Sequence, residues 1–146
     1  MADTPYALIV GAGSGLSASL ARRFAAEGTG IALAARDPNK LAALVEETGA
    51  RAYACDARQA DDVATLFEKL ANDFGTLEVA VYNPSFRTRG PITDIDPADV
   101  ERGLAVTVFG AFLVGQAAAR QMVAQGHGSI LFTGASAGVK GYPQSA

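Results

Sequence analysis

Short apolar runs alternate along the chain with longer segments in which apolar residues recur every three or four positions. A continuous apolar run is typical of a strand that is covered on both faces, and the longer spacing is typical of an amphipathic helix. The pattern predicts a helix after each of the first four strands. The predicted strands are residues 7–10, 31–35, 51–55, 77–82 and 129–133.

Two acidic residues followed by proline mark predicted helix starts. Asp37-Pro38 and Asp96-Pro97 each place a capping carboxylate before a residue that is favoured at the first helical position. The second pair precedes a long helical pattern that continues towards Met122. Residues 83–95, which show no periodicity, are predicted to form a loop.

The alternation of strands and helices predicts a parallel sheet, because each helix returns the chain to the starting edge of the sheet by a right-handed crossover. We therefore expect one α/β domain over residues 1–146, with a doubly wound, Rossmann-like sheet of strand order 3-2-1-4-5. Ligands of such sheets bind at the carboxyl ends of the strands. The segments that follow the strands are residues 11–16, 36–37, 56–57, 83–85 and 133–136.

The composition narrows the classes of function. The 146 residues carry a net charge of −3, so nothing supplies the basic surface that nucleic-acid binding needs. The first residues resemble no export signal, and no run of about 18 apolar residues occurs, so we expect a cytoplasmic protein without a membrane partner. The only cysteine, Cys55, is interpreted as a buried core thiol. His127 and Lys140 are interpreted as surface residues, and we expect no metal site.

The first turn carries three glycines, Gly11, Gly13 and Gly15, between a strand and a helix. Glycine has no Cβ, so such a turn bends sharply and lets a phosphate approach its backbone N–H groups, while the next helix directs its positive end at that phosphate. We predict that these glycines, with Ser14 and Leu16 in the same turn, bind a nucleotide cofactor. The alternative is a turn that serves packing only.

The ends of the next strands indicate which cofactor is bound. A carboxylate after the second strand binds the ribose 2′-hydroxyl of NAD, whereas an arginine accommodates the 2′-phosphate of NADP. Arg36 therefore favours NADP over NAD. The alternative for Arg36 is a solvated surface residue. The neighbouring carboxylate, Asp37, is interpretable as a helix cap alone. Asp56 is predicted to accept a hydrogen bond from the adenine or, alternatively, from N–H groups in its own turn. The other predicted cofactor contacts are Ala57, Asn83, Pro84 and Ser85.

Several motifs, in this order and spacing, resemble the N-terminal part of the short-chain dehydrogenase/reductase family across the whole chain. They are Val-Gly-Ala-Gly-Ser-Gly-Leu at residues 10–16, Ala-Arg-Asp-Pro-Asn-Lys-Leu at 35–41, Cys-Asp-Ala at 55–57, Tyr-Asn-Pro-Ser at 82–85 and Ser-Ile-Leu-Phe-Thr-Gly-Ala-Ser-Ala-Gly at 129–138. The resemblance implies an NAD(P)-dependent oxidoreductase that moves a hydride between the nicotinamide and a small-molecule carbonyl or alcohol. It also implies a homodimer or homotetramer formed through the long helix after Pro97, and a C-terminal part of the fold beyond Ala146.

The match to the family pattern is incomplete in the cofactor loop. Gly11 and Gly15 match the first two glycines of the family's Thr-Gly-x-x-x-Gly-x-Gly loop, whereas Ser17 stands where the third glycine would be. A serine adds bulk at the point where the helix packs on the strand. After the fourth strand, Asn83 alone keeps its register within the family's Asn-Asn-Ala-Gly.

The catalytic positions depart further from the pattern. Thr107 stands where the family's long helix has a catalytic asparagine, and Ala135 aligns with the serine that polarises the substrate carbonyl. Ser136, one position later, is therefore the candidate catalytic hydroxyl. The family's Tyr-x-x-x-Lys, which supplies the proton donor, would begin beyond Ala146. Tyr142 does not replace it, because the residue four positions later is not lysine.

Two other functions are compatible with the residues. A non-catalytic NADP-binding protein, whose cofactor occupancy regulates a partner, is suggested by Ala135 and Thr107. An S-adenosylmethionine methyltransferase is suggested by the spacing of the three glycines, although Val10 stands where such enzymes often carry an acidic residue.

Overall fold

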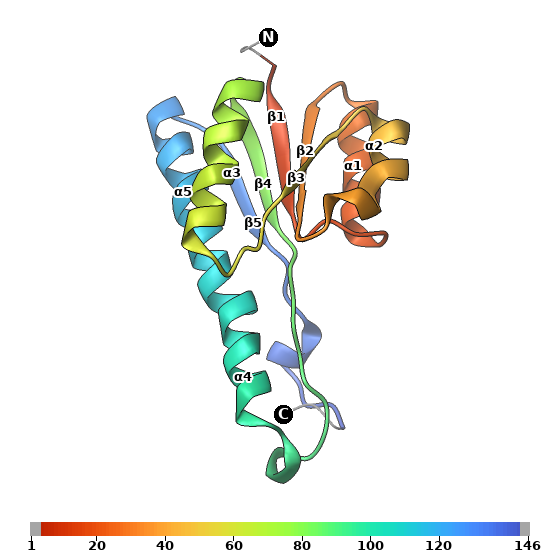
Figure 1. The fold of residues 1–146 in the computed structure, drawn as a ribbon, viewed down its shortest axis with the longest axis vertical. Helices are drawn as coiled ribbons and strands as arrows, with labels where there is room; N and C mark the ends of the chain where they lie inside the picture. The colour runs from red at the N-terminus through yellow and green to blue at the C-terminus, as the bar shows by residue number, and fades with distance from the viewer. Residues whose placement is uncertain (1–3, 144–146) are drawn as a thin grey trace.

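The computed structural model describes residues 4–143, which form a parallel sheet between two layers of helices (Figure 1). The strands pair in the order β3-β2-β1-β4-β5, and every neighbouring pair is parallel. The doubly wound order predicted from the sequence is therefore confirmed. The elements are β1 (Tyr6–Val10), α1 (Leu16–Ala26), β2 (Gly30–Ala35), η1 (Pro38–Leu41), α2 (Ala42–Thr48), β3 (Arg51–Ala54), α3 (Ala60–Asp73), β4 (Leu77–Tyr82), η2 (Ile92–Asp94), α4 (Pro97–Leu104), η3 (Ala105–Phe109), α5 (Gly110–Gln125), β5 (Ser129–Phe132) and η4 (Ser136–Gly138).

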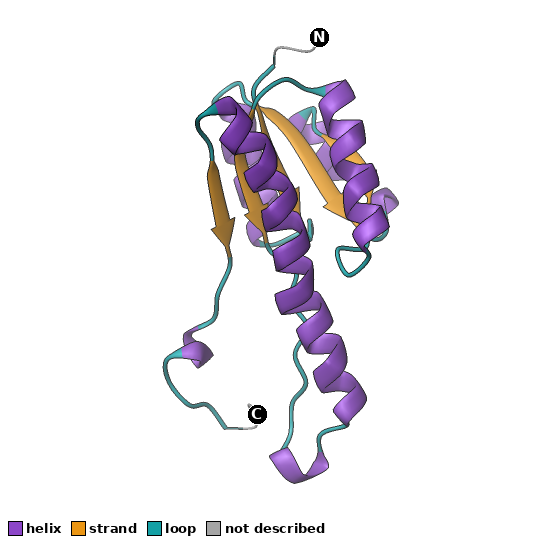
Figure 2. Cartoon of the chain, turned by 90° about the vertical axis from the view of Figure 1, so that its left-hand side faces the viewer, coloured by secondary structure: helices purple, strands orange, loops and turns teal. Residues whose placement is uncertain are grey.

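The central strand β1 contributes to two hydrophobic cores, one on each face of the sheet. Neighbouring residues of a strand point to opposite faces, so Leu8 and Ile9 belong to different cores. Ile9 is buried in one cluster with Ala18 of α1, and Leu8 is buried in the other with Leu66 of α3 and Val114 of α5. Helices thus cover both faces of the sheet, as Figures 1 and 2 show.

The strands β3 and β5 each end one residue before the predicted end. The backbone N–H of Cys55 still donates to Ala35 O at 3.0 Å, and that of Thr133 donates to Tyr82 O at 3.1 Å. Each of these residues keeps one backbone hydrogen bond to the neighbouring strand while the chain turns away, so the strand pattern extended too far in both predictions. These turns lie at the carboxyl edge of the sheet.

The long helix predicted after Pro97 runs without a break to Gln125, but not as one regular α-helix. A π-helical turn, η3, joins α4 to α5. The buried Tyr82 hydroxyl donates to the Val106 carbonyl within this turn, and a Cβ at Gly110 would overlap that hydroxyl. A strand residue and a glycine therefore fix the position of the wider turn, a kind of distortion that is frequent at functional sites.

By length and composition, Pro97–Gln125 is the one helix of residues 4–143 that is apolar enough to cross a membrane. Its second half instead packs on the sheet, because Val114, Ala118 and Met122 belong to the same buried cluster as Leu8 of β1. Its first half extends beyond the sheet (Figure 2). We therefore assign this helix to the packed fold.

The strand β5 lies at the edge of the sheet, as the sequence predicted. Its residues Leu131 and Phe132 are about half exposed, and so are Val108 and Phe112 on the long helix. An unpaired strand edge with exposed apolar side chains favours association with a further chain segment or subunit.

Candidate functional site

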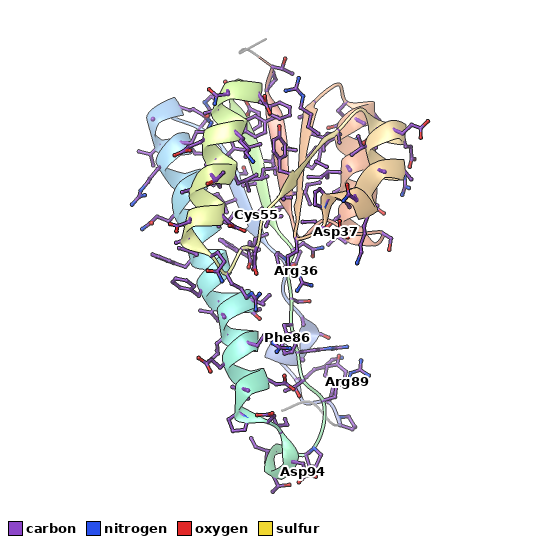
Figure 3. All side chains as sticks on the ribbon, in the orientation of Figure 1. Arg36, Asp37, Cys55, Phe86, Arg89 and Asp94 are labelled. Carbon is purple, nitrogen blue, oxygen red and sulfur yellow. The ribbon has the colours of Figure 1, made fainter. Side chains whose placement is uncertain are left out.

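An open cavity of about 1220 Å³ lies along the carboxyl ends of the strands β1 to β4. It has room for an extended ligand, and the switch point of the sheet is where such a ligand is expected. Gly15 and Leu16, at the start of α1, are not in its lining. The predicted cofactor residues that line it are Gly11, Gly13, Ser14, Arg36, Asp56, Ala57, Asn83, Pro84 and Ser85. Figure 3 labels Arg36, Asp37 and Cys55 at this edge of the sheet.

The glycine loop has one strained position and two open ones. Gly11 has a φ of +78°, and a Cβ at Gly11 would lie 2.5 Å from the Pro84 nitrogen, so the close approach of the two loops requires glycine here. A Cβ at Gly13 or Gly15 would meet no protein atom within 4 Å, and neither residue has a positive φ. The bend thus requires glycine at position 11, while the lack of a side chain at Gly13 leaves its backbone accessible from the cavity.

The N-terminus of α1 follows this loop without a side-chain cap. The first N–H groups of a helix have no partner within the helix, and they carry its positive partial charge. An anion at this end of the cavity would satisfy both features. The loop and the helix therefore form a fitting cradle for the pyrophosphate of a dinucleotide.

Ser17 links the glycine loop to the end of β4. It is 1% exposed, its hydroxyl donates to Gly11 O at 3.3 Å, and it accepts from Asn83 Nδ2 at 2.9 Å. The serine that interrupts the family's glycine pattern is thus accommodated by hydrogen bonds, a role that the sequence analysis missed. The predicted contact of Asn83 with the cofactor stays a prediction.

The two residues after β2 have different roles in the structure. Asp37 Oδ1 accepts from the Asn39 backbone N–H at 3.2 Å, so the interpretation of Asp37 as a cap is confirmed for the 3₁₀-helix η1. Asp37 also lies 3.9 Å from Lys40 Nζ. Arg36 lines the cavity and forms no ion pair within residues 4–143. Its positive charge is therefore available to a ligand.

Asp56 is engaged by Arg58, a residue that the sequence analysis did not single out. Arg58 Nη2 lies 2.6 Å from Asp56 Oδ2, Arg58 Nε lies 3.0 Å from Oδ1, and the backbone N–H of Arg58 also donates to Oδ1 at 3.1 Å. These hydrogen bonds hold the pKa of the Asp56 carboxyl below its usual value, and the charge of Arg36 contributes to the shift. The turn interpretation of Asp56 therefore describes its contacts, and a hydrogen bond to adenine stays a prediction.

Cys55 is buried beside this pair and forms no disulfide. Burial raises the pKa of its thiol to about 11, with further contributions from the charges of Asp62 and Asp56. A thiol in this state is neutral at physiological pH and a poor nucleophile. The prediction of a core thiol is therefore confirmed.

The candidate catalytic hydroxyl, Ser136, lies outside the large cavity. It lines a smaller one of about 580 Å³ between the loop after β4 and the segment after β5, together with Ala135 and Tyr142. Ser136 Oγ lies 2.7 Å from Tyr142 Oη. This hydrogen bond lowers the pKa of the Tyr142 phenol, and Lys140, whose Nζ lies 5.2 Å from the centre of the ring, contributes as well.

Thr107, at the position of the family's asparagine, uses its hydroxyl within the helix. The hydroxyl donates to Gly103 O at 2.5 Å, and the side chain is exposed. Such a bond to the preceding turn is common for threonine in helices. The only proton of this hydroxyl is thus used in a bond within the helix.

His127 lies far from these cavities, between α5 and β5. Its Nε2 is 3.2 Å from Glu78 Oε1, a carboxylate partner that the sequence analysis did not find because the two residues are 49 positions apart. Within residues 4–143, no three His, Cys, Asp or Glu side chains are arranged to hold a metal ion.

A doubly wound parallel sheet with a glycine loop before an uncapped helix at its switch point is the arrangement of a dinucleotide-binding protein. Comparison with protein families agrees, because the model of the short-chain dehydrogenases matches residues 5–146. The chain belongs to this family.

Individual relatives give the same result. The chain is 29% identical over 134 residues to D-threitol dehydrogenase of Mycolicibacterium smegmatis. This match covers 88% of this chain and 52% of that protein. The structure of NAD⁺-bound xylitol dehydrogenase is similar with a TM-score of 0.89 and 34% identity, over 99% of this chain and 58% of that one. The structure of a metagenomic short-chain oxidoreductase in complex with NADP gives a TM-score of 0.91 and 28% identity, and the match covers 99% of this chain and 68% of that one. The chain thus spans about half the length of the D-threitol enzyme.

Proposed function

We propose that this protein is an NADP-dependent oxidoreductase that transfers a hydride between the cofactor and a carbonyl or alcohol substrate. Family membership supports the reaction class, and the solved relatives bind NAD⁺ in one case and NADP in another. The observation that favours NADP is Arg36, which lines the cavity at the end of β2 without an ion-pair partner in the described part of the chain.

Several features of the cavity fit the parts of such a cofactor. The bare backbone at Gly13 and the uncapped start of α1 provide N–H donors for the pyrophosphate. Arg36 provides a planar guanidinium that binds phosphate oxygens in pairs. Arg58 holds the Asp56 carboxylate in one orientation in the lining, next to Ala57. The nicotinamide of the bound cofactor would supply the hydride chemistry, and these residues would hold the phosphate and adenosine parts of the dinucleotide.

The test of this proposal compares the binding of two cofactors by titration calorimetry. A charge-assisted hydrogen bond contributes about 1.5–3 kcal/mol, so Arg36→Ala should weaken NADPH binding about ten- to a hundredfold and leave NADH binding little changed. Arg120→Ala is the matched control, because Arg120 is an exposed arginine of α5 that does not line the cavity. Equal losses for both cofactors would show that Arg36 acts on the fold instead.

A non-catalytic NADP-binding role on the same fold is the second candidate function. Two positions favour it: Ala135 has a methyl group that cannot donate a hydrogen bond, and the Thr107 hydroxyl is bound to Gly103. Loss of one donor to a developing oxyanion typically costs about 10²–10³ in rate. Slow turnover that rises in Ala135→Ser supports the oxidoreductase, whereas tight NADPH binding with no oxidation in either protein supports the second role.

A third arm of the titration uses S-adenosylmethionine in place of NADPH. The family match favours a dinucleotide over this ligand. Binding of S-adenosylmethionine with an affinity above that of NADPH would contradict the oxidoreductase proposal and favour a methyltransferase.

A further inference from the structure

The smaller cavity carries a positive charge that the oxidoreductase proposal leaves unused. Arg87 and Arg89 line it from the loop after β4, and among residues 4–143 no acidic residue lines it. Figure 3 labels Phe86 and Arg89 on this loop, beyond the carboxyl edge of the sheet. Two arginines therefore line one cavity of about 580 Å³, and no carboxylate of the described residues lines it with them.

Three acidic residues that follow this loop along the chain, Asp94, Asp96 and Asp99, have other partners. Asp94 accepts from the Thr93 hydroxyl at 2.8 Å, and Asp96 caps α4 by accepting from the Ala98 N–H at 2.9 Å. Asp99 lies 4.0 Å from Arg102. Within residues 4–143, neither Arg87 nor Arg89 has a carboxylate oxygen within 4.0 Å.

The opposite wall of the cavity supplies a hydroxyl donor. The hydroxyls of Ser136 and Tyr142 lie 2.7 Å apart, and the bond between them uses one of their two protons. The other proton is free to be donated to an oxygen atom in the cavity. The cavity therefore offers an O–H donor on one wall and two guanidinium groups on the other.

This cavity adjoins the cofactor cavity along one loop. Residues 83–86 line the larger cavity and residues 87–89, which follow directly, line the smaller one. A substrate bound in the smaller cavity is thus held next to the segment that forms the wall of the cofactor site.

We infer that the smaller cavity binds the carboxylate of an oxo acid or hydroxy acid, with Arg87 and Arg89 as the residues that select it and Ser136 facing its carbonyl or hydroxyl oxygen. Guanidinium groups bind carboxylates in a bidentate manner, and an arginine pair rejects a neutral isostere that leaves both charges unpaired. The inference rests on the proposed function and specifies its substrate class.

The experiment compares acids with their methyl esters on the NADP-loaded protein. The substrates are 2-oxobutanoate, 4-oxopentanoate and 5-oxohexanoate, each paired with its own ester, and NADPH oxidation gives kcat and KM. We expect at least one acid to have a KM about ten- to thirtyfold below that of its ester, and the double variant Arg87→Gln/Arg89→Gln to remove this difference with kcat changed less than KM. The control Arg120→Gln, at an exposed position that lines neither cavity, should keep the difference.

A binding readout makes the result independent of turnover. Calorimetry measures pentanoate against pentanamide on the NADP-loaded protein, and the acid should bind more tightly in wild type and Arg120→Gln but not in the double variant. Equal binding of acid and amide by wild type with NADP bound would overturn the inference alone. Failure of NADPH to bind at all would overturn the proposed function, and pentanoate binding to the unloaded protein would then still test the two arginines.

Discussion

Replacement of Gly11 by alanine tests two reasons why the loop of residues 11–15 requires glycine: the backbone conformation and the close contact with Pro84. An alanine at a φ of +78° costs about 1–2 kcal/mol, and its Cβ would lie 2.5 Å from the Pro84 nitrogen and 2.7 Å from Pro84 Cδ. Overpacking of this kind costs about a further 1–3 kcal/mol. Gly11→Ala should therefore lower the free energy of unfolding by about 2–5 kcal/mol.

Two matched variants divide this loss into its parts. Gly28 has a φ of +75°, but a Cβ there would meet no atom within 4 Å, so Gly28→Ala should cost only the backbone term of about 1–2 kcal/mol. Gly13 has neither a positive φ nor a neighbour, so Gly13→Ala should leave stability unchanged or slightly increased. Its Cβ would, however, enter the cavity and weaken NADPH binding.

Urea unfolding followed by circular dichroism measures the free energy of unfolding of each variant, and titration with NADPH measures its affinity for the cofactor. The expected order of stability is Gly13→Ala, then Gly28→Ala, then Gly11→Ala. If Gly11→Ala proved as stable as Gly28→Ala, the contact with Pro84 would not be what excludes a side chain. If Gly13→Ala bound NADPH like wild type, the backbone at Gly13 would not face the cofactor.

Three further measurements test other parts of the structure. Arg58 holds the pKa of the Asp56 carboxyl below its ordinary value of 3.8. The pair therefore stabilises the fold above that pH, and this contribution is lost as the pH falls through the lower pKa of the folded state. Urea unfolding should show a difference in stability between wild type and Arg58→Ala at neutral pH, and the difference should disappear in acid. Burial raises the pKa of the Cys55 thiol to about 11, so about one thiol in a thousand is ionised at pH 8. A disulfide reagent should therefore label Cys55 slowly until urea unfolds the protein. Rapid labelling of the folded protein would contradict the burial of this thiol. Phe112 is 57% exposed on the long helix that we propose as the contact between subunits, so Phe112→Asp should reduce the mass measured by light scattering, and an unchanged oligomer would exclude this surface.

The fold was predictable because strands covered by helices on both faces leave continuous apolar runs in the sequence. The limits of β4, at Leu77 and Tyr82, match the predicted strand. The π-helical turn was not predictable from the helical pattern, because the apolar spacing continues through it. That turn depends on contacts of Val106 and Gly110 with Tyr82, which is 24 positions before Val106 in the sequence.

The candidate site was predictable where its chemistry lies within a few residues of a strand end. The cap at Asp37 and the bend at Gly11 are both local features. The bond from Asn83 to Ser17 joins residues 66 positions apart, so no local spacing indicates it. Arg58, two positions after Asp56, was within reach of local reasoning, since an arginine next to a turn carboxylate is a common ion pair.

The departures from the family pattern have different consequences at the glycine loop and at the catalytic positions. Behind the glycine loop, Ser17 stands where the family has a glycine, yet its hydroxyl makes two hydrogen bonds and the bare backbone at Gly13 is kept. On the catalytic side, Ala135 has lost a donor and the hydroxyl of Thr107 is bound within its own helix. We therefore predict that cofactor binding and turnover are separable in this chain, because the departure at Ser17 is accommodated by hydrogen bonds, whereas Ala135 lacks a hydroxyl and the Thr107 hydroxyl is already bound. For this reason the ratio of NADPH affinity to oxidation rate, rather than either value alone, distinguishes an oxidoreductase with an altered donor from a protein that binds the cofactor without using it.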